Sequence, residues 1–323
     1  MISGDGMKRF WQDFLVAVTA GLIVPMIIVS TFSRTYKGKD RDINNIETTV
    51  STEPRSTTTV AVVFDENKVS NMDLNSYLIG VVLAEMPASF ETEALTAQAV
   101  VARTYTLKRI SDGKKHKNGD VCVNPDCCQA YSSETNLLSN EMLEKVKCAV
   151  SSTDGQVLMY DGAYIEATYF SCSGGRTEDA VAVWGTEIPY LQAVDSPGEE
   201  NAAHYMDDVS FTIEEFCGRL GINYDAALQI QNVTYTDGGG VNTITISGKE
   251  FSGTQLRSAL GLRSTMFSIA LMADKVTVTT RGFGHRVGMS QYGAQAMAKE
   301  GKRYTEILSY YYQGTTLCSD LQH

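Results

Sequence analysis

The sequence predicts a mixed α+β domain of helices and antiparallel hairpins, preceded by one N-terminal transmembrane helix. Asp161-Gly162 separates two β-prone runs, which is a strong signal for a two-residue hairpin turn. The stretch from Glu91 to Ile110 keeps apolar residues at helical spacing. Ahead of both, the run from Phe14 to Phe32 carries no charge and is long enough to span a bilayer as a helix. Helices and hairpins mixed in this irregular order are typical of the α+β class.

The chain of 323 residues divides into four parts by composition. Residues 1–13 form a short N-terminal segment, residues 14–32 the transmembrane anchor and residues 33–58 a polar linker. The ordered domain is expected over residues 59–323, with an inserted subdomain at about residues 203–273. A cleaved signal peptide is the alternative for the apolar run, but no Ala-x-Ala-type cleavage site follows it. An uncleaved single anchor is therefore preferred.

The first elements of the domain are a strand and three helices. The valine-rich stretch 59–64 predicts a short strand. A helix is expected to begin after Asp73 and to end before Pro87, because proline cannot continue it. Two further helices are predicted at residues 91–110 and 139–151.

The later elements are hairpins followed by short helices. Glycine-containing turns between β-prone runs predict the hairpins, and glycines that follow apolar stretches mark the helix ends. The hairpins are expected at residues 157–160 with 163–170 and at 230–235 with 241–247, and the helices at residues 254–260, before Gly301 and at residues 304–313.

Glu85 is the most informative residue of the chain. Its carboxylate shares the apolar stripe formed by Leu78, Val81 and Val82 in the last turn of a helix. Partial burial and the negative end of the helix dipole both disfavour the charged form and raise the pKa of the carboxyl group. A raised pKa suits a general acid that works near neutral pH. The alternative is a glutamate at a frayed helix end, reaching water beside an apolar face.

Charge and cysteine usage exclude several classes of protein. The formal net charge is −11, from 27 Lys and Arg against 38 Asp and Glu, which argues against nucleic acid as the main partner. The sequence has no Rossmann or P-loop glycine pattern. The seven cysteines are odd in number and unevenly spaced, unlike a disulfide framework.

Distinctive motifs follow one another from about residue 59 to the C-terminus. They are Ala84-Glu85-Met86-Pro87, Cys128-Gln129-Ala130-Tyr131, Ser173-Gly174-Gly175-Arg176, Gly282-Phe283-Gly284-His285 and Gln291-Tyr292-Gly293-Ala294. Together they resemble the sporulation stage II protein D family, whose domain is shared with the amidase-enhancer proteins. The chain departs from the family pattern at Phe170 and Arg286, where members often carry histidine and glycine.

The resemblance implies a lytic transglycosylase with its elements arranged around a glycan groove. Such an enzyme cleaves the bond between N-acetylmuramic acid and N-acetylglucosamine in peptide-stripped peptidoglycan strands and leaves 1,6-anhydro ends. Glu85 would be the general acid and base, and a single carboxyl group suffices because the muramic C6 hydroxyl replaces water. The implied setting is spore engulfment.

The resemblance also suggests residues that bind the substrate. Several have a structural alternative: stabilising the loop after Pro87 for the arginine, a tight glycine turn for the histidine, and packing in the first turn of a helix for the last two. These residues are Arg103, Ser173, Gly174, Gly175, His285, Gln291 and Tyr292.

Some family members bind zinc through a Cys-x4-His-Cys stretch. Here Cys122 occupies the first position and Cys127 stands in place of the histidine. Thiolates bind zinc well, so a structural zinc site is one hypothesis, completed by ligands from elsewhere. A cluster of thiols without metal is the other. The proposed chemistry itself requires no cofactor.

The resemblance implies partners and a location as well. The partners would be peptidoglycan strands, an amidase of the stage II protein P type and a membrane scaffold of the stage II protein M type. The domain would lie outside the cytoplasm, held to the septal or engulfing membrane by a single span.

Two alternative functions are kept. The first is a non-catalytic peptidoglycan-binding activator of an amidase, in which Glu85 serves binding alone. The second is a cysteine hydrolase built from Cys128 or Cys172 with His285, although no recognised nucleophile motif surrounds either thiol.

Overall fold

The computed structural model of the chain describes residues 58–66, 68–113, 115–135, 138–224, 228–272 and 274–319. The predicted N-terminal segment, anchor and nearly all of the linker lie outside these residues. None of the helices within the described ranges is long and apolar enough to cross a bilayer. The anchor at residues 14–32 therefore stays a prediction.

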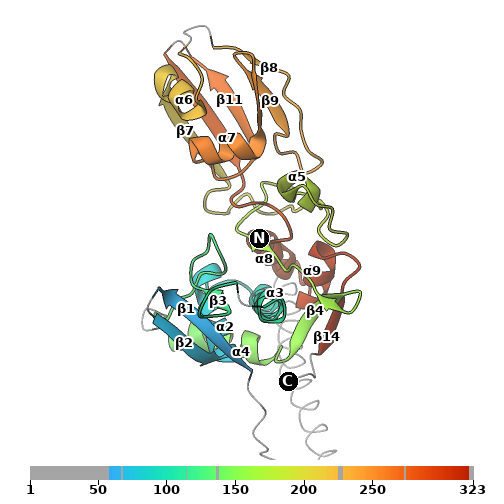
Figure 1. The fold of residues 1–323 in the computed structure, drawn as a ribbon. Helices are drawn as coiled ribbons and strands as arrows, with labels where there is room; N and C mark the ends of the chain where they lie inside the picture. Colours follow the sequence, from blue (N-terminus) through green and yellow to red (C-terminus); the bar gives the residue numbers. More distant parts are fainter. Residues whose placement is uncertain are drawn as a thin grey trace, which may run out of the picture. The chain divides into compact units, whose positions relative to one another are not determined.

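The described chain is a mixed α+β structure, as predicted (Figure 1). Its first half contains β1 (Thr59–Asp65), β2 (Lys68–Asp73), α2 (Leu74–Glu85), α3 (Thr92–Ser111), β3 (Val121–Cys122), α4 (Asn140–Ser151), β4 (Gln156–Tyr160), β5 (Ala163–Tyr164), β6 (Tyr169–Phe170) and α5 (Ala180–Trp184). Its second half contains β7 (Met206–Thr212), α6 (Ile213–Leu220), β8 (Ile230–Gln231), β9 (Thr243–Ile246), β10 (Lys249–Ser252), α7 (Gly253–Leu260), β11 (Phe267–Leu271), β12 (Lys275–Arg281), β13 (Met289–Ser290), α8 (Gln291–Lys299), α9 (Tyr304–Tyr311) and β14 (Thr316–Ser319).

Helix α3 is the centre of the first hydrophobic core. Every residue from Ala94 to Leu107 is buried, and α2, α4, α8, α9 and β4 all contact the helix. Its sequence is rich in alanine and threonine, whose small side chains let neighbouring elements approach closely. Two of its buried threonine hydroxyls are satisfied within the helix, because Thr104 and Thr106 each donate to the carbonyl four residues earlier, at 2.8 Å.

The predicted Asp161-Gly162 turn is confirmed, but the strand after it is shorter than expected. Both turn residues have positive φ, 48° and 79°, as a two-residue hairpin turn requires. Strands β4 and β5 pair antiparallel around the turn. The second strand was predicted to continue to residue 170, yet pairing with β4 ends at Tyr164. The chain then leaves this sheet, and β6 pairs in parallel with β13 from the C-terminal region.

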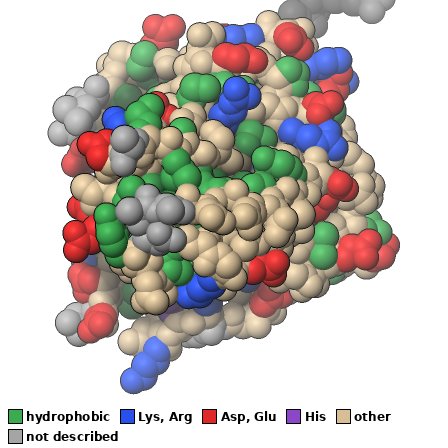
Figure 2. Space-filling model, turned by 90° about the horizontal axis from the view of Figure 1, so that it is seen from above, with side chains coloured by type: hydrophobic (Ala, Val, Ile, Leu, Met, Phe, Trp, Pro, Cys, Tyr) green, Lys and Arg blue, Asp and Glu red, His purple; other side chains and the backbone are tan. Residues whose placement is uncertain are grey.

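The segment from Met206 to Arg281 builds a second hydrophobic core around Phe216, Ile244 and Leu256. Two three-stranded sheets, β11-β12-β7 and β10-β9-β8, surround it with α6 and α7 (Figure 1). Both helices begin with a capping box and end at a left-handed glycine, so local sequence sets their limits. On the face seen in Figure 2, Lys and Arg side chains are interspersed with Asp and Glu.

A buried ion pair connects the second core to the rest of the domain. The Arg286 guanidinium lies 3.1 Å from the Glu178 carboxylate, and both side chains are buried. Arg286 also donates to the carbonyls of Ser173, Arg176 and Gly238 at 2.6–2.7 Å. Glu178 accepts in turn from the backbone N–H of Gly240. Residues 238 and 240 belong to the loop that leads into β9, so one guanidinium holds this loop against the segment before α5.

We expect Arg286→Ala to lower the free energy of unfolding by about 3–5 kcal/mol, because it leaves the Glu178 carboxylate buried and unpaired. Urea unfolding of the full-length protein measures this loss. Lys147→Ala removes an exposed ion pair with Glu144 and is the control, with an expected change below about 1 kcal/mol. Equal effects of the two substitutions would contradict the role of the buried pair.

Candidate active site

Glu85 is the last residue of α2, as the sequence predicts. Asp73 is the N-cap of the helix, and its side chain accepts a hydrogen bond from the Ser76 N–H at 2.9 Å. It ends because Met86 is extended, with φ −127° and ψ 143°, ahead of Pro87. The helix buries most of its length in the first core, and Glu85 itself is half-buried.

Three donors from distant parts of the chain converge on the Glu85 carboxylate. Its Oε1 accepts from the Ala130 N–H at 2.8 Å and from the Tyr169 hydroxyl at 3.1 Å. Its Oε2 accepts from the Gln291 side-chain amide at 3.4 Å. None of the three donors is charged. Among the described residues, the negative charge is therefore stabilised by hydrogen bonds rather than by a salt bridge.

The pKa of Glu85 is raised above its ordinary value. Burial is the largest cause, and the hydrogen bonds from Ala130, Tyr169 and Gln291 oppose it without cancelling it. The direction agrees with the sequence prediction. A carboxyl group in this state can carry a proton at higher pH than an exposed glutamate, and donors are already in place for its ionised form.

A chain of hydrogen bonds leads from Glu85 through Tyr169 into the protein interior. The Tyr169 hydroxyl lies within hydrogen-bonding distance of both Glu85 Oε1 and Gln129 Oε1, the latter at 3.2 Å. Gln129 is held from behind, because its amide donates to the hydroxyls of Thr106 at 3.0 Å and Tyr77 at 3.3 Å. Burial raises the pKa of Tyr169 far above its usual range, so its hydroxyl keeps its proton. That one hydrogen can point to an ionised Glu85 or, once Glu85 is protonated, to Gln129.

His285 lies beside this group without touching Glu85. The pKa of His285 is lowered to about 4, because burial and, to a smaller extent, the positive charge of Arg257 outweigh the opposing effect of a hydrogen bond to the Tyr169 backbone. Its Nδ1 accepts from the Val287 N–H at 3.1 Å, so the ring is neutral with the proton on Nε2. The ring also contacts Phe170 and Trp184 at centroid distances of 5.7 Å. His285 therefore fixes the backbone of the strand that carries Tyr169.

Gln291 and Tyr292 open helix α8 and differ in what they contact. Gln291 reaches Glu85, as described, so it orients the acid rather than standing free for a ligand. The Tyr292 ring packs edge-on against Phe90 at 5.1 Å, in the segment that follows the Glu85 helix. This contact favours helix packing over substrate binding as the role of Tyr292.

The glycine loop at residues 173–175, for which the sequence predicts substrate binding, makes structural contacts within the protein. Ser173 and Gly174 are buried, and their N–H groups donate to Glu199 Oε2 at 2.7 and 3.0 Å. Gly174, with φ +81°, lies so close to residues 281–282 that a Cβ would come within 3.0 Å of their backbone. Gly175 is half-buried beside them. The loop needs glycine for this close approach of two backbone segments.

Arg103 is held by contacts within the protein, which favour its structural alternative over substrate binding. It is 1% exposed and donates to the Thr153 and Val150 carbonyls at the end of α4, at 2.5 and 3.0 Å. It donates as well to the Asn75 side chain at 2.9 Å. Asn75 lies at the opposite end of α2 from Glu85, about 15 Å away for ten helical residues.

Sequence reasoning missed Tyr169, Gln129 and Glu199. Two of them lie in or next to recognisable motifs, but nothing in the sequence indicates which side chain of a motif faces Glu85. Glu199 is buried and accepts hydrogen bonds from the hydroxyls of Ser173, in the glycine loop, and Ser290, the N-cap of α8. It therefore joins the glycine loop to the helix that supplies Gln291.

Four side chains that can bind a metal ion lie together next to this site. They are His116, Cys122, Cys127 and Cys128, whose ligand atoms all lie within 4.8 Å of one another. Cys122 is fixed by the parallel pairing of β3 with β1, and the N–H groups of residues 127 and 128 both donate to the Asn124 carbonyl. One imidazole and three thiols match the tetrahedral ligand sets of structural zinc sites. The sequence prediction included only Cys122 and Cys127. Cys128 lies in the same motif, and His116 is recognisable as a ligand only from the folded chain.

The thiols do not form the nucleophile and base pair of a cysteine hydrolase. Cys172 is fully buried, and burial raises the pKa of its thiol to about 11. The Cys128 thiol lies 3.3 Å from His116, within the metal-ligating group, rather than beside His285. Cys172 is therefore a buried, protonated thiol, and Cys128 belongs to the metal-ligating group.

Comparison with known proteins identifies the family. The family model "Stage II sporulation protein" matches residues 65–160. The chain is 38% identical to the stage II sporulation protein D of Bacillus subtilis (strain 168), over 96% of each chain. It is 37% identical to the protein of the same name from Bacillus amyloliquefaciens, over 92% of each chain. It is also 30% identical to the amidase enhancer of Bacillus subtilis (strain 168), over 75% of this chain and 40% of that protein.

These similarities, together with the α+β fold, define the chain as a sporulation protein. It belongs to the stage II sporulation protein D family.

We expect Tyr169→Phe to raise the pKa of Glu85 further, because it removes one donor to the ionised carboxylate. Hydrogen bonds to charged groups contribute about 1.5–3 kcal/mol. Titration of the Glu85 side-chain carboxyl carbon by NMR measures the change. Tyr292→Phe removes a hydroxyl from a ring that packs on Phe90 and should leave this titration as it is in the wild type. An unchanged or lower pKa in Tyr169→Phe would contradict the assigned hydrogen bond.

Proposed function

We propose that the protein is a membrane-anchored lytic transglycosylase that cleaves peptide-stripped peptidoglycan strands. The bond broken joins C1 of N-acetylmuramic acid to O4 of the next N-acetylglucosamine, and the product carries a 1,6-anhydro end. The observation that carries the proposal is one half-buried glutamate with a raised pKa, held by three neutral donors. Similarity to stage II sporulation protein D supports it.

Glu85 would act first as acid and then as base. Its proton goes to the leaving O4 as the C1–O4 bond breaks, because burial favours the protonated carboxyl group. The carboxylate that results is stabilised by Ala130, Tyr169 and Gln291. It then takes the proton of the muramic C6 hydroxyl, whose oxygen bonds to C1. Atoms and protons balance without water, and Glu85 ends the cycle protonated.

One carboxyl group is sufficient for this reaction and too few for ordinary glycoside hydrolysis. Hydrolytic glycosidases use a second carboxylate, as nucleophile or to activate water, within about 5–10 Å of the acid. Among the hydrogen bonds of the described residues, no second carboxylate joins Glu85 or its three donors. The proposed reaction needs no second carboxylate, because its nucleophile is supplied by the sugar itself.

We propose a structural zinc ion for the group formed by His116, Cys122, Cys127 and Cys128. The ion would supply cross-linking of the loop and no step of the reaction. The loop ends at Cys128, two residues before Ala130, whose N–H donates to Glu85. Fixing the loop would therefore fix one of the three donors.

The cellular part of the proposal rests on the sequence. The uncharged run at residues 14–32 supports a single span, with the domain outside the cytoplasm at the septal or engulfing membrane. The substrate implies an amidase that removes stem peptides beforehand, of the stage II protein P type, and a scaffold of the stage II protein M type would organise the two.

A second candidate function is activation of an amidase without catalysis. It is favoured by the 30% identity to a protein named amidase enhancer. In that case the protein would present strands to the amidase, and Glu85 would serve in binding.

We expect Glu85→Gln to lower the cleavage rate by at least about 10²–10⁴-fold, the usual contribution of a general acid or base. The full-length protein in detergent is incubated with peptide-free glycan strands, and the products are identified by mass spectrometry. Anhydro-ended fragments should appear with the wild type and with the control Glu134→Gln, an exposed glutamate.

Two other outcomes would decide against this mechanism. Fragments with reducing ends would indicate hydrolysis and a second carboxylate. Intact strand binding without any fragments, together with faster peptide release by an added amidase, would favour the activating function.

We expect one zinc ion per chain by elemental analysis, lost in Cys128→Ser and kept in Cys148→Ser, which alters an exposed thiol. Loss of the ion should lower the melting temperature by more than about 5 °C. Replacement of zinc by cadmium should preserve cleavage, because the ion would hold the loop rather than activate water. A cadmium-loaded protein that is folded and inactive would contradict the structural role.

A further inference from the structure

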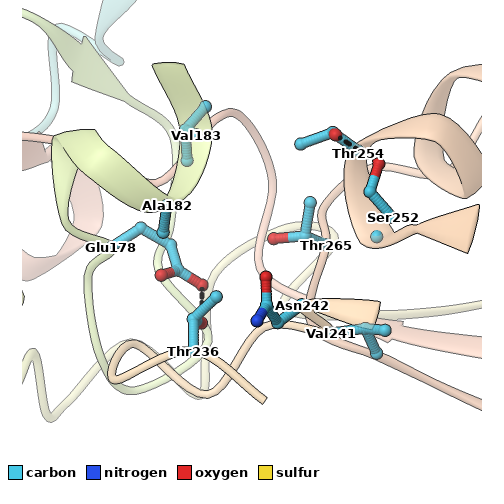
Figure 3. Close-up of a pocket in the computed structure, with 10 residues that line it drawn as sticks. Glu178, Ala182, Val183, Thr236, Val241, Asn242, Ser252, Thr254 and Thr265 are labelled. Atoms are coloured by element: carbon cyan, nitrogen blue, oxygen red, sulfur yellow. Dashed lines mark hydrogen bonds between the residues drawn. The ribbon is translucent and has the colours of Figure 1, made fainter. Parts of the chain in front are cut away.

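Glu199 is a buried carboxylate that the proposed reaction does not use. Of the residues that the structure describes, the buried carboxylates are Glu178 and Glu199, each 1% exposed. Glu178 forms an ion pair with Arg286, and Figure 3 shows it lining a small hollow, where the Thr236 hydroxyl donates to it at 2.7 Å. No cation of the described ranges forms an ion pair with Glu199. Because an ionised carboxylate is costly to remove from water, other contacts must compensate the charge of Glu199.

Five neutral donors compensate this charge. The Oε2 atom of Glu199 accepts from the N–H groups of Ser173 and Gly174 at 2.7 and 3.0 Å and from the Ser173 hydroxyl at 2.8 Å. The Oε1 atom accepts from the Ser196 hydroxyl at 2.6 Å and from the Ser290 hydroxyl. Hydrogen bonds to an ionised group are stronger than those between neutral groups, so the carboxylate holds its donors firmly in place.

Two of these donors belong to the segments that supply Tyr169 and Gln291 to Glu85. Ser173 lies four residues after Tyr169, and Ser290 immediately precedes Gln291. The two segments pair in parallel as β6 and β13, over two residue pairs. So short a ladder contributes little stability by itself. A carboxylate that binds both segments just beyond the ladder therefore keeps them together.

The charge of Glu199 also fixes the start of α8. The Ser290 hydroxyl has one hydrogen, and Glu199 is the closer of its two acceptors. The lone pairs of the same oxygen accept from the Gly293 N–H at 3.1 Å, which caps the helix. The first turn packs against the carboxylate, since a Cβ on Gly293 would come within 2.9 Å of Glu199 Oε1. The helix therefore begins at a fixed place, and its first residue, Gln291, reaches Glu85 at 3.4 Å.

From these contacts we infer that Glu199 is a positioning residue, which holds Tyr169 and Gln291 in contact with Glu85. The inference rests on the proposed function, in which both groups stabilise the carboxylate left after proton donation. The Gln291 contact is the longest of the three to Glu85, so a small displacement of α8 removes it. Glu199 acts through the hydroxyl and backbone groups that it binds and takes no part in the proton transfer itself.

We expect Glu199→Gln to raise the pKa of Glu85, because two donors to the ionised carboxylate are displaced. NMR titration of the Glu85 side-chain carboxyl carbon in the full-length protein measures the change. A direct effect of the lost negative charge would have the opposite sign, since removal of a nearby anion lowers the pKa of a carboxyl group. The control is Glu93→Gln, because Glu93 is also half-buried and accepts from the Tyr304 N–H, at the start of α9. An unchanged or lower pKa in Glu199→Gln would overturn the inference.

A combined variant shows whether Glu199 acts through the two donors. Both are already absent in Tyr169→Phe/Gln291→Leu, so the addition of Glu199→Gln should leave the pKa of Glu85 where it is in this background. A further rise would overturn the positioning role. If Glu199→Gln fails to fold, Ser290→Ala decides, since it removes the hydroxyl that links the carboxylate to α8. Its titration should shift in the same direction, and an unchanged titration would count against the inference.

Reaction rates separate this inference from the proposed function. With peptide-free glycan strands, Glu199→Gln should lower kcat roughly ten- to a hundredfold and change KM little, because the displaced donors act on the carboxylate that forms during the reaction. Glu93→Gln should keep the kcat of the wild type. If the wild type yields no anhydro product, the proposed function fails and the titration alone decides on Glu199. An effect of Glu199→Gln confined to KM would contradict the positioning role.

Discussion

A half-buried carboxylate needs hydrogen-bond donors that its own helix does not supply. Glu85 ends α2, where the free backbone groups are carbonyls and the helix dipole is negative, so the local structure opposes its charge. The donors come instead from residues 130, 169 and 291, far apart in the sequence. Much of the remaining architecture can be understood as the means of holding these three donors in place.

Each donor is fixed by a different interaction. The segment of Ala130 follows the metal-ligating loop, and the neighbouring Gln129 is anchored to the hydroxyls of two core residues. Tyr169 is set by the parallel pairing of β6 with β13 and by His285. Gln291 is set by its N-cap Ser290, which donates to the buried Glu199. Loss of one of these positioning interactions would therefore remove one donor and leave the other two. The pKa of Glu85 is then expected to respond to each interaction separately.

The local elements could be predicted from the sequence, and most contacts of the site could not. Pro87 marks the end of the Glu85 helix, and Asp161-Gly162 marks the hairpin, because both signals act within a few residues. The pairing of Tyr169 with the C-terminal segment leaves no periodic pattern, and so the strand was extended too far in the prediction. Polar motif residues were assigned to substrate, although Arg103 and Ser173 are buried and bind carbonyl or carboxylate groups of the protein. A motif shows that a residue is constrained, and only the fold shows by which contact.

The left-handed backbone of Arg286 illustrates how the two cores are joined. Its φ of 67° would cost about 1–2 kcal/mol in a residue other than glycine. The three hydrogen bonds to carbonyls and the ion pair of its guanidinium offset that cost and fix the loop of Gly238 beside the turn that carries His285. The first core thus supplies the acid, and the turn at residues 284–286 joins it to the second core through Gly284, which donates to Arg263, and Arg286, which donates to Gly238.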